Sequence, residues 1–152
     1  MIDENWMQAA IELARYAATL GEIPVGAVVV KNDQIIGEGY NRRESTKNAL
    51  EHAEVIAITK ACQAVGDWRL TNCTLYVTLE PCPMCAGAVV NSRIGRVVFG
   101  ASDALAGCCG SVLNLNAYPF NHAFSLTGGV CEEECRELLQ HFFAQRRKES
   151  KR

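Results

Sequence analysis

The sequence contains no apolar run of about 18 residues, and it therefore predicts no transmembrane helix. Its first residues, MIDENWMQ, are acidic and lack the basic segment of a secretory signal peptide, so we expect a cytoplasmic protein with no membrane contact. No internal repeat, low-complexity tract or linker divides the chain. We therefore expect residues 1–152 to form a single domain, long enough to bury a core without disulfides.

A strong net charge is also absent, and the value of −2 argues against a generic nucleic-acid-binding protein. The charge is unevenly distributed, because residues 144–152 carry five basic side chains and one acidic side chain. This tail is thus +4 and the rest of the chain −6. Such a strip can bind phosphate groups, or it can be a solvated terminus, and charge alone leaves both interpretations open.

Eight cysteines are many for a cytoplasmic chain, but without a secretory signal they do not indicate a disulfide framework. Metal binding and buried free thiols are the better interpretations. Cys131 and Cys135 lie four residues apart on one predicted helix face, which favours burial against the sheet. Cys108 and Cys109 lie in a glycine-flanked loop, and the sequence assigns them no role.

Hydrophobic periodicity predicts an α/β fold in which strands alternate with helices around a central sheet. Asn32-Asp33 separates two β-rich runs and predicts a tight hairpin turn, whereas Asn48 followed by Glu51 resembles a helix cap. We expect helices at 5–20, from the Asn48 cap to about Val65, at 83–91 and at 131–148. Strands are expected at 25–30, 35–40, 75–79, 97–99 and 124–126. Residues 41–48 should form a loop, and residues 100–121 should form loops with short helical turns.

Two short segments at predicted helix starts carry metal-ligating side chains. The first is His52-Ala53-Glu54 and the second is PCPMC, which supplies Cys82 and Cys85. Zinc accepts one imidazole and two thiolates, and three protein ligands leave a fourth position for a catalytic water. A helix N-terminus favours the thiolate form that binds metal. Glu54 is then free to carry the proton of that water.

Each segment alone is a weak signal. A lone Cys-X-X-Cys pair can be a redox pair or half of a zinc knuckle, and a lone His-X-Glu is commonly incidental. Together, with Cys82 following Glu54 by 28 residues, they form the signature of the zinc-dependent nucleobase deaminases. The remaining histidines, His122 and His141, have no partner cluster in the sequence and are not expected to be ligands.

Longer segments resemble the bacterial tRNA-specific adenosine deaminases: GEIPVGAVVV, NALEHAEVIAI, TLYVTLEPCPMCAGAVVNSRIGRVVFGASD and the closing HFFAQRRK. The resemblance covers roughly residues 5–148. It implies a three-layer cytidine-deaminase-like fold, with a five-stranded mixed sheet between helices, and a homodimer. It also implies conversion of adenosine to inosine at the wobble position of a tRNA anticodon, mainly in the arginine tRNA with anticodon ACG.

The resemblance also assigns roles to individual positions. It implies that His52, Cys82 and Cys85 hold one zinc ion and that Glu54 is the acid and base. It further implies one group of residues around the base and another group on the RNA. The base contacts are Val25, Asn41 and the backbone of Ala53, and the RNA contacts are Asp103, Phe143, Arg146 and Arg147.

The chain departs from the family pattern at two positions. Ser102 and Ala144 stand where relatives commonly have basic residues, so two RNA-contacting charges are missing. Arg42 and Arg43, which directly follow Asn41, could replace them. Phe142 and Phe143 project about 100° apart on a helix, so one of the two rings is expected in the core.

Three functions remain open from the residues alone. The first is deamination of adenosine in tRNA, for which a basic aromatic tail supplies stacking and phosphate contacts. The second is deamination of a free nucleobase, nucleoside or nucleotide, such as guanine or cytidine, which needs no such tail. The third is a non-catalytic zinc module, which would need Cys108 or Cys109 as a fourth ligand.

Overall fold

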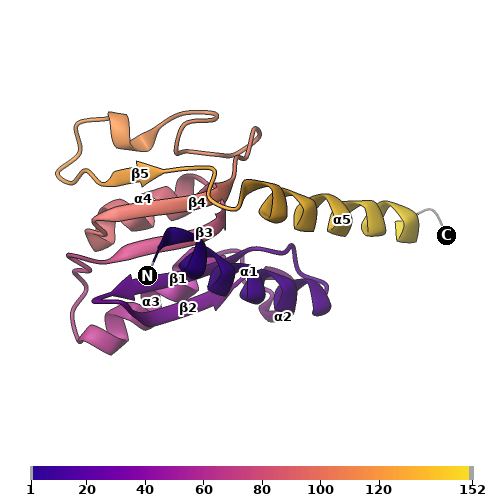
Figure 1. Ribbon diagram of the computed structural model, residues 1–152, viewed down its shortest axis with the longest axis horizontal. Coiled ribbons are helices and arrows are strands. Elements are labelled where there is room, and N and C mark those ends of the chain that lie inside the picture. Colours follow the sequence, from indigo (N-terminus) through magenta and orange to yellow (C-terminus); the bar gives the residue numbers. More distant parts are fainter. Residues whose placement is uncertain (1, 151–152) are drawn as a thin grey trace.

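The computed structural model describes residues 2–150, which form a five-stranded sheet with helices on both faces (Figure 1). Lys151 and Arg152 of the basic tail lie outside the described residues. In chain order the elements are α1 Asp3–Thr19, β1 Gly26–Lys31, β2 Gln34–Tyr40, α2 Arg43–Thr46, α3 Ala53–Val65, β3 Thr74–Leu79, α4 Pro83–Ser92, β4 Arg96–Ala101, the 3-10 turn η1 Leu115–Ala117, β5 Ser125–Thr127 and α5 Glu132–Ser150.

The sheet has the order β2-β1-β3-β4-β5 and mixed strand directions. Strand β1 is antiparallel to β2 and β3, whereas β3, β4 and β5 are parallel. Asn32 and Asp33 join β1 to β2 with positive φ angles of 50° and 57°, as the hairpin prediction requires. The predicted α/β fold with a five-stranded mixed sheet is therefore confirmed.

Two apolar clusters divide the helices between the faces of the sheet. One cluster joins α3 and α4 to the sheet, and the other joins α1 and α5 to the opposite face. Helix α3 lies very close to β2, because a Cβ on Gly39 would lie 2.4 Å from the carbonyl oxygen of Ala53. Two glycines in β2, Gly37 and Gly39, thus let the first and middle turns of α3 rest directly on the strand.

Two local predictions are wrong. The helix predicted from the Asn48 cap begins later, with His52 as its N-cap, because the Asn48 side chain accepts a hydrogen bond from Leu50 N in a turn. The predicted loop 41–48 contains the short helix α2. The buried carboxylate of Glu22 shapes this segment by accepting hydrogen bonds from backbone N–H groups of α2, a contact that local sequence does not reveal.

The start of α1 is tied to the sheet by an ion pair. Arg96 of β4 donates two hydrogen bonds to Asp3, at 2.9 and 2.7 Å, and the Tyr76 hydroxyl of β3 donates a third at 2.9 Å. The hydrogen bond from Arg96 holds the pKa of Asp3 below its ordinary value. Within residues 2–150, no helix is long and apolar enough to cross a membrane.

Replacement of Asp3 by Asn should lower the free energy of unfolding at pH 7 by about 1 kcal/mol, because it removes a partly exposed charge-assisted pair. A carboxylate whose pKa is depressed on folding stabilises the protein above its unfolded pKa, near 3.9, and this contribution is lost as the pH falls through its folded pKa. The difference between Asp3→Asn and the unchanged protein should therefore shrink below about pH 4. Urea unfolding at several pH values measures it.

Glu4→Gln is the matched control, because Glu4 is an exposed acid in the same first turn of α1 and has no ion-pair partner within residues 2–150. Both substitutions remove the same charge from the helix N-terminus. An equal loss of stability in the two variants would show that the helix dipole, and not Arg96, is responsible.

Candidate metal centre and substrate cleft

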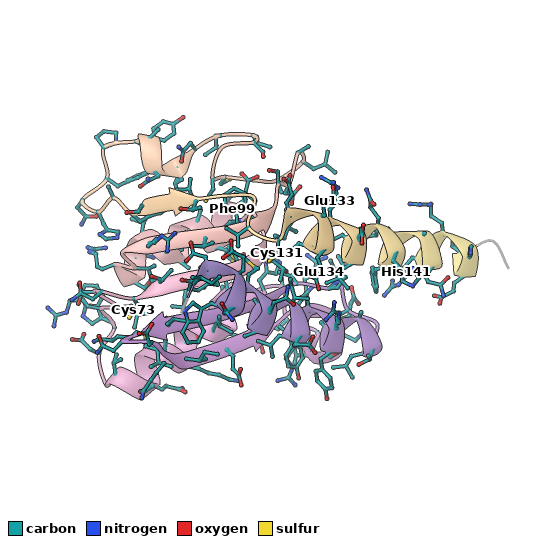
Figure 2. All side chains as sticks on the ribbon, viewed as in Figure 1. Cys73, Phe99, Cys131, Glu133, Glu134 and His141 are labelled. Carbon is teal, nitrogen blue, oxygen red and sulfur yellow. The ribbon has the colours of Figure 1, made fainter. Side chains whose placement is uncertain are left out.

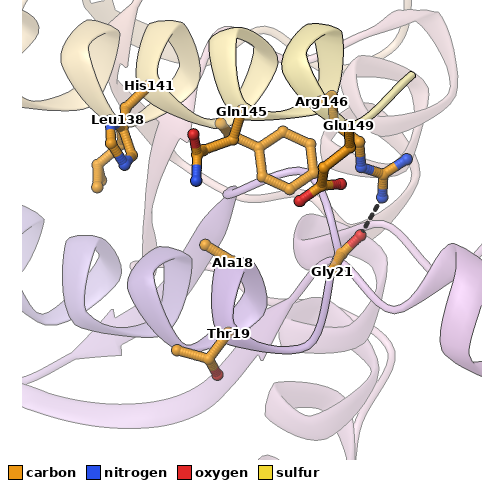
Figure 3. Close-up of a pocket in the computed structure, with 9 residues that line it drawn as sticks. Ala18, Thr19, Gly21, Leu138, His141, Gln145, Arg146 and Glu149 are labelled. Atoms are coloured by element: carbon orange, nitrogen blue, oxygen red, sulfur yellow. Dashed lines mark hydrogen bonds between the residues drawn. The ribbon is translucent and has the colours of Figure 1, made fainter. Parts of the chain in front are cut away.

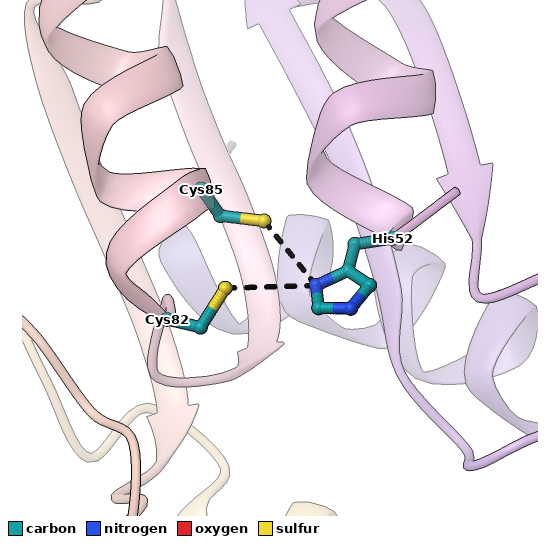
Figure 4. Close-up of side chains that lie close together, drawn as sticks. All are labelled: His52, Cys82 and Cys85. Atoms are coloured by element: carbon teal, nitrogen blue, oxygen red, sulfur yellow. Dashed lines mark hydrogen bonds between the residues drawn. The ribbon is translucent and has the colours of Figure 1, made fainter. Parts of the chain in front are cut away.

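The three predicted metal ligands lie together. Nδ1 of His52 is 3.6 Å from Sγ of Cys82 and 3.6 Å from Sγ of Cys85 (Figure 4). All three ligand atoms lie within 4.8 Å of one another. Residues at the starts of two helices therefore form one compact N/S cluster, in which His52 precedes the two cysteines by 30 and 33 positions.

The cluster has the size that zinc requires. A tetrahedral zinc ion holds a His nitrogen at about 2.1 Å and a thiolate at about 2.3 Å, which separates those two atoms by about 3.6 Å. Both measured N–S distances have this value. Imidazole and thiolate ligands also favour zinc over the hard cations magnesium and calcium. The residues present thus fit a zinc ion in both chemistry and spacing.

The two helix starts explain why these side chains face each other. His52 is the N-cap of α3 and Cys82 is the N-cap of α4, with Pro83 at the first position of that helix. Both caps have extended backbone conformations, and neither side chain is recorded as a capping hydrogen-bond acceptor for its helix. The imidazole and the sulfur are consequently free to point across the gap between the two N-termini.

The cluster favours negative charge. A hydrogen bond from the Cys85 thiol, together with His52, lowers the pKa of Cys82 to about 4. Because Cys85 donates that bond and is buried, its own pKa is raised. Hydrogen bonding to Cys82 also raises the pKa of His52. A divalent cation would add the positive charge that ionises the second thiol.

Glu54 lies in the first turn of α3, beside this cluster, and its side chain is only 4% exposed. Burial raises the pKa of Glu54 to about 7, and the negative charge of Cys82 acts in the same direction. A carboxyl group with a pKa near neutrality can both accept and release a proton at physiological pH. This combination of burial and a facing thiolate is typical of an active site.

A cleft of about 890 Å³ opens in front of the cluster, within the size range of ligand pockets. It brings together eight of the eleven residues that the sequence assigned to the site. These are Val25, Asn41, His52, Ala53, Glu54, Cys82, Asp103 and Phe143. Cys85 lies behind the cleft wall as a fully buried ligand. Arg146 and Arg147 do not line the cleft.

The side chain of Asn41 is fixed at the end of β2. Its amide nitrogen donates to the carbonyl of Ile23 at 3.4 Å, and its amide oxygen accepts from the backbone N–H of Arg43 at 3.1 Å. An amide has two N–H donors and two acceptor positions, so one of each remains for a ligand. Asn41 can therefore offer a donor and an acceptor to the polar edge of a base.

Asp103 has a structural task in the loop after β4. Its carboxylate accepts hydrogen bonds from the backbone N–H groups of Leu105 and Ala106, at 3.0 and 3.2 Å. The side chain therefore holds a turn whose residues line the cleft. Direct contact between Asp103 and RNA stays a prediction.

Helix α5 places two adjacent aromatic residues differently. Phe143 is 41% exposed and lines the cleft, whereas Phe142 is partly buried under the Arg146 guanidinium, 5.0 Å from its ring centre. Arg146 also donates to the backbone carbonyl of Gly21, as Figure 3 shows. Arg146 thus ties α5 to the end of α1, whereas the Arg147 side chain makes no hydrogen bond or ion pair within residues 2–150.

Two buried acidic residues at or near the cleft were not predicted from the sequence. Glu80 lines the cleft and is 2% exposed, and Glu22 is buried behind α2. The sequence did contain a signal for each of them. Glu80 is an acidic residue directly after an apolar strand, and Glu22 is an acidic residue inside the apolar run GEIPVGAVVV. Of the two arginines after Asn41, Arg43 lines the cleft and Arg42 lies over the ring of Tyr40, and an RNA contact by either stays a prediction.

The remaining cysteines do not join the metal cluster. All eight are free thiols, and among residues 2–150 the group able to hold a metal contains only His52, Cys82 and Cys85. Cys73 and Cys131 lie in separate places (Figure 2), and Cys109 is part of the apolar core. With no fourth protein ligand among the described residues, the cluster has the composition of a catalytic zinc site.

Comparison with known proteins agrees with this chemistry. The model of the MafB19-like deaminase family matches residues 1–147. The tRNA-specific adenosine deaminase of Bacillus subtilis (strain 168) is 51% identical over 150 residues, which cover 98% of this chain and 93% of that protein.

Two solved structures are also similar. One comes from studies of A-to-I editing by tRNA:A34 deaminases; it has a TM-score of 0.86 and 38% identity, and the match covers 89% of this chain and 99% of the other. The other is a guanine deaminase from Bacillus subtilis, with a TM-score of 0.64 and 41% identity over 67% of this chain and 66% of the other. The chain therefore belongs to the MafB19-like deaminases and, among them, to the family of tRNA-specific adenosine deaminases.

Proposed function

We propose that this protein hydrolytically deaminates adenosine to inosine at the wobble position of a tRNA anticodon, mainly in the arginine tRNA with anticodon ACG. The observation that carries the proposal is the cleft, in which a zinc-type cluster, the buried carboxyl group of Glu54 and the exposed ring of Phe143 face one space. The names of the similar proteins support the tRNA substrate.

Zinc held by His52, Cys82 and Cys85 would supply a water that is nucleophilic near neutral pH. Glu54 takes a proton from the attacking water as its oxygen bonds to C6 of adenine. The same carboxyl group then gives a proton to the amino group, the C–N bond breaks, and ammonia leaves. Asn41 holds the polar edge of the base, while Val25 and the backbone of Ala53 pack against it.

The RNA contacts come from elements around the cleft. A loop nucleotide must leave its stack before its base can enter, and an exposed aromatic ring can stack on the neighbouring base. Phe143 supplies such a ring. Arg43 and Arg147 supply positive charge for phosphate groups, whereas Arg146 contributes by holding α5 against α1.

A deaminase of a free base is the second candidate, because a guanine deaminase shares 41% identity over two thirds of this chain. For deamination of a free base, this protein would need the metal cluster and Asn41 but not the cleft wall from α5. Turnover of an anticodon stem-loop, measured beside turnover of free adenosine, guanine and cytidine, separates the two activities. Turnover of free guanine in preference to the stem-loop would contradict the tRNA proposal.

Glu54→Gln should reduce the deamination rate by a factor of about 10² to 10⁴, because the amide cannot move the proton. The substitution preserves volume at a buried position, so the zinc content should not change. Inosine formation in a wobble-adenosine stem-loop and metal analysis of the same preparations give both values.

Cys82→Ser is the complementary variant, and it should lose zinc and activity together, because it removes one ligand of the cluster. The two variants thus separate proton transfer from metal binding. A fully active Glu54→Gln enzyme would refute the role assigned to Glu54.

Arg43→Ala should weaken stem-loop binding and reduce the slope of log K against log salt by about 0.7, the value for one lost phosphate contact to single-stranded nucleic acid. Arg43 lines the cleft, and no carboxylate within residues 2–150 forms an ion pair with its guanidinium. Binding titrations at several salt concentrations measure the slope.

Arg69→Ala is the matched control, because it removes the same charge outside the cleft, beside Asp67. An equal change in slope for both variants would show a general effect of net charge and would contradict a contact at Arg43.

We further propose a cytoplasmic homodimer built from one domain, residues 1–152. The tRNA substrate supports the location. Exposed apolar side chains in the loop after β4 support the dimer, since Leu105 is 93% exposed, and Val112 and Leu113 are also exposed. Light scattering should give a molar mass of about twice 16.6 kDa. A stable monomer at micromolar concentration would contradict the dimer.

A further inference from the structure

We propose that Glu80 is a positioning residue whose buried carboxylate holds residues 102–111 as a preformed wall of the substrate cleft. The inference rests on the proposed function for its substrate, an RNA loop, but the contacts themselves belong to the free protein. Glu80 follows β3 directly and lies two residues before the ligand Cys82.

The carboxylate of Glu80 is satisfied entirely by this one segment. Oε1 accepts from the backbone N–H of Asp103 at 3.0 Å and from the hydroxyl of Ser111. Oε2 accepts from the backbone N–H of Cys109 at 2.9 Å and from that of Ser111 at 3.0 Å. Four donors from both ends of the segment therefore converge on a side chain that is 2% exposed.

No cation shares this task within residues 2–150, where none of the ion pairs includes Glu80. A buried carboxylate without a cation is costly unless hydrogen bonds replace its water. Release of residues 102–111 would leave the charge buried and unsatisfied, so the segment and the carboxylate hold each other in place.

The segment is also built to fit around the carboxylate. A Cβ on Gly107 would lie 2.4 Å from Cδ of Glu80, so only glycine permits this approach. Cys108 N donates to the carbonyl of Pro81 at 2.8 Å, which adds a backbone bond beside the side-chain bonds. The stretch from Glu80 to Cys82 thus connects the cleft wall to the metal cluster.

The outer surface of this segment forms part of the cleft, through residues 102–106. These residues include the turn that Asp103 stabilises, and they have no regular secondary structure. Any part of such an irregular loop that became ordered only when RNA binds would cost conformational entropy and so weaken affinity. Glu80 therefore contributes to substrate binding through the loop that its carboxylate holds.

Glu80→Gln is the decisive substitution, because its amide replaces one acceptor with a donor that faces N–H groups. We expect faster hydrogen exchange at the amides of Asp103, Cys109 and Ser111 in the free holoenzyme. We also expect a half-saturating stem-loop concentration raised about tenfold, with the single-turnover rate at saturation changed less than threefold. Zinc content should stay the same.

Ser111→Ala keeps the carboxylate and removes one of its four donors, so it should shift exchange and half-saturation in the same direction by a smaller factor. If Glu80→Gln does not fold, the exchange and binding measurements on Ser111→Ala decide whether Glu80 holds the loop. Glu22→Gln is the matched control, since it removes a buried carboxylate that holds α2 and should leave exchange at Cys109 and Ser111 unchanged.

Three results would overturn the proposal. The first is unchanged hydrogen exchange in residues 102–111 of both Glu80→Gln and Ser111→Ala. The second is loss of the single-turnover rate at saturation with an unchanged half-saturating stem-loop concentration. The third is loss of zinc from Glu80→Gln, which would show that Glu80 acts on the ligand Cys82. The exchange measurement needs no substrate. It therefore still decides the role of Glu80 if the stem-loop is not deaminated, a result that would refute only the proposed function.

Discussion

The approach of two helix N-termini on one face of the sheet is the constraint on which the site depends. Helix α3 can begin beside β2 because Gly39 lets the strand and Ala53 come into contact. Helix α4 begins shortly after β3, the neighbour of β1. N-cap residues lie outside the helical backbone, so His52 and Cys82 extend from the two ends toward each other. A helix that began at residue 48 would have put His52 inside its first turns and out of this position.

Three buried glutamates lie in or near the site, and the balance between burial and hydrogen bonding gives them opposite properties. Burial raises the pKa of a carboxyl group. For Glu54, burial is the main cause of a pKa raised to about 7. Glu22 and Glu80 are equally buried by area, yet bonds from hydroxyl and backbone N–H groups outweigh burial and lower their pKa values. For Glu54, burial outweighs the hydrogen bonds that the carboxylate accepts from its own backbone N–H and from the Cys85 thiol, so this group can exchange protons, whereas the other two stay charged and hold loops.

The sequence predicted the metal ligands and the sheet because both depend on short-range patterns. Ligand types and helix starts are visible locally, and β-branched runs mark the strands. The cleft walls could not be predicted in this way. They depend on contacts such as those from Glu22 to Ser45 and from Glu80 to Ser111, which join residues 23 and 31 positions apart. Arg146 shows the same limit, because its hydrogen bond to the carbonyl of Gly21 joins residues 125 positions apart and is not visible in the local sequence.

Helix α5 turns a general deaminase centre into a cleft suited to a larger substrate, and its placement has two physical anchors. Near its start, Cys135 packs so close to β4 that a Cβ on Gly100 would lie 2.4 Å from its sulfur. Near its end, Arg146 bonds to the loop after α1. Phe143 lies between these anchors, so its exposed ring has a fixed position at the cleft, while the basic last turn extends past the sheet (Figure 1). A free base would be enclosed by the inner residues alone, and an aromatic wall continued by a basic helix end matches bases that are joined by phosphates.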